Sequence, residues 1–167
     1  MKIGTFVLAL LTVPAAVAVE PALSVTPEIE AAMVQIRAGE ASCVLVREGA
    51  IVAEALGSGV LPLLTLLDEN RSEMEGADLV DKIVGRAAAM MAIEGGVRSV
   101  TAMVMSEDAR DLLQAHGIVV NARCFVPQIL DRNFAGRCPM EQAVMEIEDS
   151  AEGVSALRAR LQQMGII

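Results

Sequence analysis

A strand–helix–strand unit over residues 97–122 constrains the fold of this chain more than any other segment. The apolar runs at 97–105 and 118–122 predict two strands. Between them, Ser106 is a typical helix N-cap and Gly117 is typical of a helix end. Two strands joined by a helix are normally parallel, with a right-handed crossover. The unit therefore predicts an α/β domain.

Other apolar patterns place further elements around this unit. Short runs at 42–46 and 50–55 predict a β-hairpin around a polar turn. Leu79 to Met91 repeat apolar residues at helical spacing before Gly95, which predicts a long helix over 78–93. Further helices are predicted over 27–38, 60–67, 139–147 and 151–164, with a helical turn over 126–130. This order predicts three layers, with helices on both faces of a sheet.

The charge of the chain excludes direct binding of nucleic acid. The 167 residues include 13 Lys and Arg against 22 Asp and Glu, a net charge of −9. A nucleic-acid groove needs clustered basic residues, and no basic run is present. The chain also has no Trp or Tyr to stack on bases, so its core is built from aliphatic residues and Met.

The N-terminus is predicted to be a targeting segment. Residues 1–18 combine Lys2, an apolar run and the small-residue cleavage signal Ala16-Val17-Ala18, as in a signal peptide. The run is too short to span a bilayer, so no stable membrane span is expected after its removal. Residues 19–26 are a linker, and 27–167 form one domain. Export is expected, unless the start codon is misplaced and translation begins near Met33, which would leave the protein cytoplasmic.

Cys138 lies at a predicted helix start. Pro139 suits the first turn of a helix, and Glu141 occupies the third helical position, where its carboxylate would reach back to the cap N–H. A thiol at this cap would lie near unpaired backbone donors and the positive end of the helix dipole, which favour the thiolate. The alternative is that Cys138 only caps the helix and packs.

Four segments resemble one family of small prokaryotic proteins, known only as a domain of unknown function with a cytidine-deaminase-like fold. The specific motifs are Asp81-Lys82-Ile83-Val84-Gly85 and Cys138-Pro139-Met140-Glu141; the four segments are 42–49, 59–64, 81–88 and 138–144. The resemblance covers about residues 27–164. It implies a three-layer α/β/α sandwich with a mixed sheet, and it brings no activity with it. The chain departs from the family pattern at Asp131, Phe134 and Arg137.

The ligands of a zinc-dependent deaminase are missing from the sequence. Such enzymes need a His or Cys beside a catalytic Glu at one helix start and two Cys at another. The corresponding predicted starts offer Asp81-Lys82, and Ser106 with Ala109. The one histidine, His116, has no Glu two residues later. Zinc-dependent deamination is therefore excluded, and no metal or other cofactor is predicted.

The predicted site is a metal-free cleft formed by helix N-termini. Its leading interpretation is binding of a small anionic or nucleotide-like ligand by Asp81, Lys82, Arg86, Ser106 and Cys138. Lys82 and Arg86, one helical turn apart, are expected to reach the same anion.

Two alternatives remain open for these residues. One is a metal-free enzyme with Cys138 as nucleophile or redox thiol, and Lys82 or Glu141 as its acid–base partner. The other is a structural or interaction domain in which the same residues only cap helices. No oligomeric state is predicted.

Overall fold

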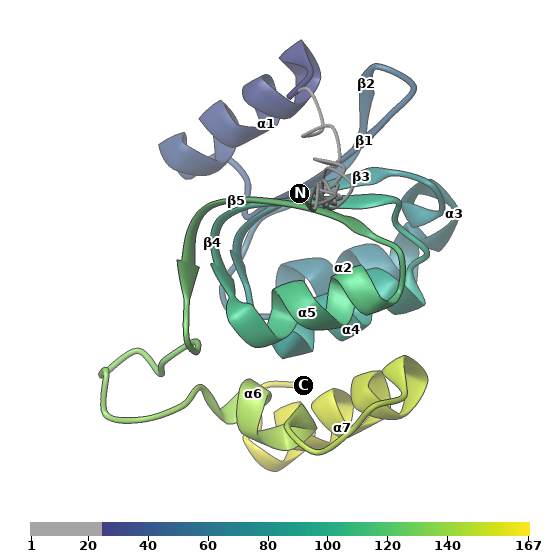
Figure 1. Ribbon diagram of the computed structural model, residues 1–167. Helices are drawn as coiled ribbons and strands as arrows, with labels where there is room; N and C mark the ends of the chain where they lie inside the picture. The colour runs from purple at the N-terminus through teal and green to yellow at the C-terminus, as the bar shows by residue number, and fades with distance from the viewer. Residues whose placement is uncertain (1–24) are drawn as a thin grey trace, which may run out of the picture.

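The computed structural model describes residues 25–167; the predicted signal peptide and most of the predicted linker lie outside this range. Figure 1 shows the arrangement of the elements. In chain order they are α1 (Pro27–Ala38), β1 (Cys43–Arg47), β2 (Ala50–Ala55), α2 (Leu61–Glu69), α3 (Arg71–Met74), β3 (Asp78–Val84), α4 (Arg86–Glu94), β4 (Ser99–Ser106), α5 (Glu107–Ala115), β5 (Val119–Val126), α6 (Pro139–Val144) and α7 (Ser150–Gln163).

The sheet is mixed and has the strand order β2-β1-β3-β4-β5. Strand β1 is antiparallel to both β2 and β3, whereas β3, β4 and β5 are parallel to one another. Helix α1 lies on one face, and α2, α4 and α5 lie on the other, with α6 and α7 packed outside α4 (Figure 1). The predicted three-layer α/β/α sandwich with a mixed sheet is confirmed, and so is the parallel unit β4–α5–β5.

Each face of the sheet covers its own apolar cluster, because successive side chains of a strand point to opposite faces. Along β1, Cys43 and Leu45 belong to the larger cluster, which is packed against α2, α4, α5 and α7. Val44 and Val46 belong to the smaller one, under α1, which also contains Ile29, Met33, Ile36 and Val80. Helix α1 therefore packs on the sheet through one narrow stripe of apolar side chains.

The predicted helix over 78–93 is wrong, because its first half is strand β3 and only its second half is helix α4. The two elements are separated by Gly85, which has an extended backbone. The apolar residues of 79–84 fit a helical period and a short buried strand equally well. The segment forms a strand because it pairs with β1 on one side and with β4 on the other.

The predicted helical turn over 126–130 is also wrong. Strand β5 continues to Val126, and the chain then forms a loop closed by a bridge between Leu130 and Arg137. Inside it, the Asp131 carboxylate accepts hydrogen bonds from the N–H groups of Asn133 and Ala135, at 2.9 and 3.0 Å. The loop protrudes from the body between β5 and α6 (Figure 1).

Helix α7 packs closely on α4. Gly153 of α7 faces Met90 of α4, and a Cβ added at Gly153 would lie 2.1 Å from the Met90 sulfur. A larger residue here would force the Met90 side chain to move, which accounts for a glycine inside a helix although glycine is a poor helix former. Within residues 25–167, no helix is both long and apolar enough to cross a lipid bilayer.

Candidate functional site

Two of the predicted site residues, Lys82 and Cys138, lie on opposite faces of the sheet. Lys82 lies on β3 and faces the α1 side of the sheet, beside Ile36 and Met103. Cys138 packs against the larger cluster on the opposite side. Lys82 and Arg86 are not one helical turn apart as expected, because the chain between them is strand followed by a glycine.

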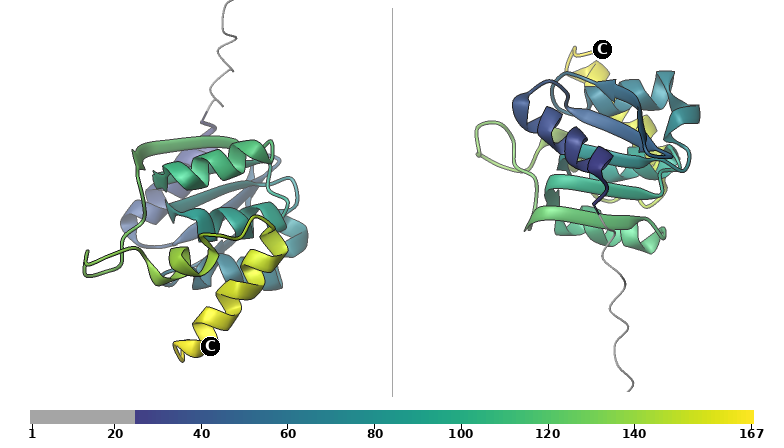
Figure 2. Two further views of the ribbon diagram at one scale, coloured as in Figure 1. Left: turned by 60° about the horizontal axis from the view of Figure 1, so that its bottom comes forward. Right: turned by 90° about the horizontal axis from the view of Figure 1, so that it is seen from above.

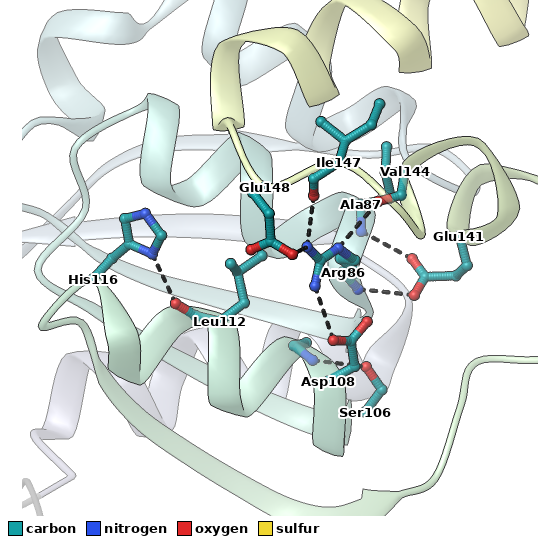
Figure 3. A network of polar contacts seen from close by, with 11 residues as sticks. Arg86, Ala87, Ser106, Asp108, Leu112, His116, Glu141, Val144, Ile147 and Glu148 are labelled. Carbon is teal, nitrogen blue, oxygen red and sulfur yellow. Dashed lines mark hydrogen bonds and ion pairs between the residues drawn. The ribbon is translucent and has the colours of Figure 1, made fainter.

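Arg86 is a buried link between four segments (Figure 3). Its guanidinium donates to Asp108 of α5 at 2.9 Å and to the carbonyl oxygens of Val144 and Ile147, at 3.1 and 2.6 Å. It also meets Glu148 at 3.4 Å. Only 8% of the side chain is exposed, so these contacts use the donors that an external anion would need.

Glu141 caps helix α4, and not its own helix as predicted. Its carboxylate accepts hydrogen bonds from the backbone N–H groups of Arg86 and Ala87, at 2.8 and 3.0 Å (Figure 3). A Cβ on Gly85 would lie 2.4 Å from this carboxylate, so the glycine permits the approach. Burial raises the pKa of Glu141 and the charge of Asp108 adds to this, while the two N–H groups and Arg137 oppose it. The N-terminus of α4 thus already holds an anion.

Ser106 and Cys138 occupy helix starts with different surroundings. The buried Ser106 hydroxyl accepts a hydrogen bond from the Ala109 N–H at 3.1 Å and so caps α5, in the way its position in the sequence indicates. The Cys138 side chain forms no cap bond, and its backbone N–H donates to the Ile129 carbonyl oxygen at 3.0 Å. The thiol is half-buried against the core.

Asp81 faces away from Lys82, toward Cys43 and the larger cluster. Its carboxylate accepts a hydrogen bond from the Ile83 N–H at 3.1 Å. Burial raises the pKa of Asp81 to about 7, although the N–H groups of Ile83 and Lys82 oppose the shift. Burial also raises the pKa of the Cys43 thiol, and the Asp81 charge adds to that increase. Cys43 is fully buried in the core, whereas Asp81 is half-buried beside it.

A groove lies between α1 and the part of the sheet that α1 leaves open. Helix α1 packs over β1, β2 and β3, and seen from above it leaves β4 and β5 uncovered (Figure 2). One hollow, of about 320 Å³, is lined by Ile36, Arg37, Lys82, Ile83, Met103 and Val104. A second, of about 290 Å³, is lined by Val25, Glu30, Met33, Arg37, Thr101, Ala102, Asn121, Ala122 and Arg123. Arg37 borders both hollows, so we treat them as one groove, the α1 groove.

Three exposed cations border the α1 groove: Arg37, Lys82 and Arg123. Within residues 25–167 none of them forms an ion pair. Sequence reasoning singled out Lys82 but missed both arginines. Arg37 directly follows the buried Ile36 of α1, and Arg123 lies in β5 one residue beyond the predicted strand over 118–122. The positions of Arg37, Lys82 and Arg123 in the sequence form no motif, so the sequence does not indicate that the three lie together.

Residues 25–167 contain no cluster of three or more His, Cys, Asp or Glu side chains that could hold a metal ion. The α1 groove offers a different set of groups: three cations and two uncharged polar side chains lie among apolar ones, together with one carboxylate, Glu30. Such a lining suits a small organic anion, whose charge the cations stabilise while its carbon skeleton lies on Met33, Ile36 and Met103.

Comparison with known proteins identifies relatives of this chain. A model of the family "Domain of unknown function (DUF1893)" matches residues 31–161. Among solved structures, the chain is similar to a DUF1893 family protein, TM1506, from Thermotoga maritima: the identity is 24%, the TM-score is 0.72, and 80% of this chain and 89% of that chain are covered. This similarity supports the fold described above.

Two further solved structures are more distant. One is dCMP deaminase from the cyanophage S-TIM5, at 19% identity and a TM-score of 0.46, covering 58% of this chain and 98% of that one. The other is NE0047 in complex with 2,6-diaminopurine, at 15% identity and a TM-score of 0.39, covering 84% and 80%. No curated protein matches the sequence.

Proposed function

We propose that this chain, which belongs to the DUF1893 family, binds a small anionic molecule in the α1 groove. The observation that carries the proposal is the gathering of Arg37, Lys82 and Arg123 around one groove, without ion-pair partners within residues 25–167. The whole chain has a net charge of −9, so a local excess of positive charge opposes the general field of the protein.

The cations come from three separate elements and converge through the sheet register. Residues on either side of Lys82 pair with those on either side of Met103, and the same holds for Met103 and Arg123. Lys82 and Arg123 therefore flank Met103 on neighbouring strands, about 10 Å apart in backbone position. Arg37 approaches from α1 above them. An anion lying over Met103 would be within reach of all three side chains.

The helix N-termini predicted as the ligand site are less suitable. At α4, an external anion would have to displace Glu141 from two backbone N–H groups and then lie among Asp108 and Glu148. At α5, the Ser106 hydroxyl already accepts a hydrogen bond from the backbone N–H of Ala109. Helix starts bind anions through unpaired N–H groups, and the side chains of Glu141 and Ser106 already occupy three of these donors.

The enzyme interpretation of Cys138 stays a prediction. Glu141, one expected acid–base partner, is engaged at the start of α4. Lys82, the other expected partner, lies on the α1 side of the sheet, across from the cluster that contacts Cys138. We therefore do not assign a reaction to the thiol.

Calorimetric titration of the full chain with inorganic pyrophosphate tests the proposal. We expect binding that weakens with added salt, since exposed cations are screened. Lys82→Ala and Arg37→Ala should each lower the affinity about tenfold, the cost of losing one hydrogen bond to a charged group. Arg132→Ala is the matched control: it removes one exposed cation that does not line the groove, and it should leave the affinity nearly unchanged.

Chemical labelling gives an independent location for the bound anion. Lys82 is the only lysine within residues 25–167, so an amine-reactive reagent followed by peptide mass spectrometry reports on this position alone in that part of the chain. Pyrophosphate should protect Lys82 from labelling. Equal affinities for all three variants, or labelling of Lys82 that pyrophosphate does not slow, would contradict the proposal.

A further inference from the structure

We infer that the ligand of the α1 groove also carries an uncharged amide or lactam, which binds Thr101 and Asn121 beside the cations. The inference rests on the proposed function and adds the chemical class of the ligand. It depends on a second feature of the groove, separate from its charge: two buried polar atoms that have no hydrogen-bond partner within residues 25–167, the Thr101 hydroxyl oxygen and the Asn121 amide nitrogen.

The two side chains are direct neighbours in the sheet. Thr101 of β4 pairs with Asn121 of β5, and both line the hollow of about 290 Å³. Thr101 is only 6% exposed and Asn121 is half-buried, so the two side chains have little contact with bulk water. Buried polar groups are nearly always hydrogen-bonded in folded proteins, because an unpaired one loses its hydration without compensation. Both groups line the same hollow, so one acceptor atom of a bound molecule would complete the hydrogen bonding of both.

The hydrogen-bonding chemistry of Thr101 and Asn121 restricts the kind of ligand group that they can bind. The Asn121 nitrogen can only donate, and the Thr101 hydroxyl donates equally well, so the ligand must present an acceptor. One carbonyl oxygen has two lone pairs and can accept from both side chains. Glu30 lines the same hollow, and its carboxylate can accept a hydrogen bond from an N–H of a ligand. A carbonyl beside an N–H, the edge of an amide or lactam, fits this arrangement of two donors and one acceptor.

The spacing between the two parts of the groove sets the size of the ligand. Thr101 and Met103 are successive residues on the α1 face of β4, about 6.6 Å apart. Lys82 and Arg123 lie beside Met103, whereas Asn121 lies beside Thr101. Arg37 spans both parts. The anionic group and the amide edge are therefore separated by about one small sugar or a chain of a few bonds.

Three matched probes test the inference on the full chain: UMP has a phosphate and a lactam edge, ribose 5-phosphate has only the anion, and uridine has only the edge. We expect UMP to bind about tenfold more tightly than ribose 5-phosphate, since completing two buried donors contributes at least this much. Thr101→Val keeps the shape and removes the hydroxyl. It should remove most of the advantage of UMP and leave the affinity for ribose 5-phosphate unchanged, whereas Lys82→Ala should weaken both.

Controls separate the inference from the proposed function. Thr65→Val, at an exposed position of α2, should change neither affinity. Thr101→Val should also raise the Tm of the free protein, since it removes an unpaired buried hydroxyl. Equal binding of UMP and ribose 5-phosphate, insensitive to Thr101→Val, would overturn the inference but not the anion site. Failure of both phosphates to bind would overturn the proposed function as well.

Discussion

Glu141 accepts a hydrogen bond from the backbone N–H of Arg86 at 2.8 Å, so a side chain of α6 caps a helix that begins 55 residues earlier. The Arg86 side chain in turn donates to the carbonyl oxygen of Val144, at the end of α6. The two residues therefore join α4 and α6 through reciprocal contacts, one from backbone to side chain and one from side chain to backbone. Helix α6 has only six residues and depends on these contacts for its position.

Removing the Glu141 carboxylate should destabilise the fold. Glu141→Ala leaves two buried N–H groups of α4 unpaired, and we expect the free energy of unfolding to fall by about 2 kcal/mol. Urea unfolding measures the change. Glu146→Ala is the control, because this exposed carboxylate forms no side-chain hydrogen bond within residues 25–167. If Glu141→Ala lowered the free energy of unfolding no more than Glu146→Ala does, the capping role would be contradicted.

Arg86→Met should be more costly than the loss of a surface ion pair. It removes the cation between Asp108 and Glu148 and frees two carbonyl oxygens, for an expected loss of about 3 kcal/mol. Arg158→Met breaks the exposed pair with Asp68 and should cost less than about 1 kcal/mol. Thermal unfolding of the two variants in parallel compares them. Similar losses would show that the Arg86 contacts are not a structural link.

Asp81 should make the stability of the protein depend on pH. Its pKa is about 7 in the folded state and 3.8 in an ordinary environment, so the folded state binds more protons between these values. The free energy of unfolding therefore has a contribution that is complete below about pH 4 and is lost as the pH rises through 7. The slope in this window is at most about 1.4 kcal/mol per pH unit.

Asp81→Asn isolates this contribution, because the amide keeps an acceptor for the Ile83 N–H but does not titrate. The variant should gain stability relative to the natural chain as the pH is raised from 5 to 8. Urea unfolding at several pH values measures the difference, with Glu69→Gln, at an exposed position, as the control. A difference between Asp81→Asn and the natural chain that stays constant with pH would rule out the raised pKa.

Gly153→Ala should lower stability although alanine favours helices. The added methyl would overlap the Met90 sulfur, and overpacking of this kind costs about 1–3 kcal/mol, more than the roughly 1 kcal/mol gained in helix propensity. Combined with Met90→Ala, the added methyl occupies space that the methionine leaves. The double variant should therefore lose less stability than the two single variants lose together. A double-mutant cycle measures this difference. Simple additivity would disprove close packing of α4 and α7.

Much of the fold could be predicted because its signals are local. The caps at Thr26 and Ser106 depend on the side chain and N–H groups two or three residues later, and both are observed. The parallel unit over 97–122 and the hairpin follow from short apolar runs and turn residues. The predicted family is confirmed by the match over residues 31–161.

Strand β3 could not be predicted with the same rules. Leu79, Val80, Ile83 and Val84 satisfy a helical repeat, and the strand forms because β1 and β4 offer backbone partners on both sides. That pairing is non-local, and it changes which residues share a face. In a helix, Lys82 and Arg86 would be neighbours; in the actual chain Lys82 lies exposed on the α1 side and Arg86 is buried.

The amino-acid sequence by itself determined the α/β class, the helix caps and the choice of Lys82 as a candidate ligand-binding residue, because each depends on residues close together in the chain. Only the tertiary structure decided the neighbours of Lys82: Met103 and Arg123 arrive through strand register, and Arg37 through the packing of α1. Register and packing are set by contacts between distant segments, and a shift of one residue would turn every side chain of a strand to the other face.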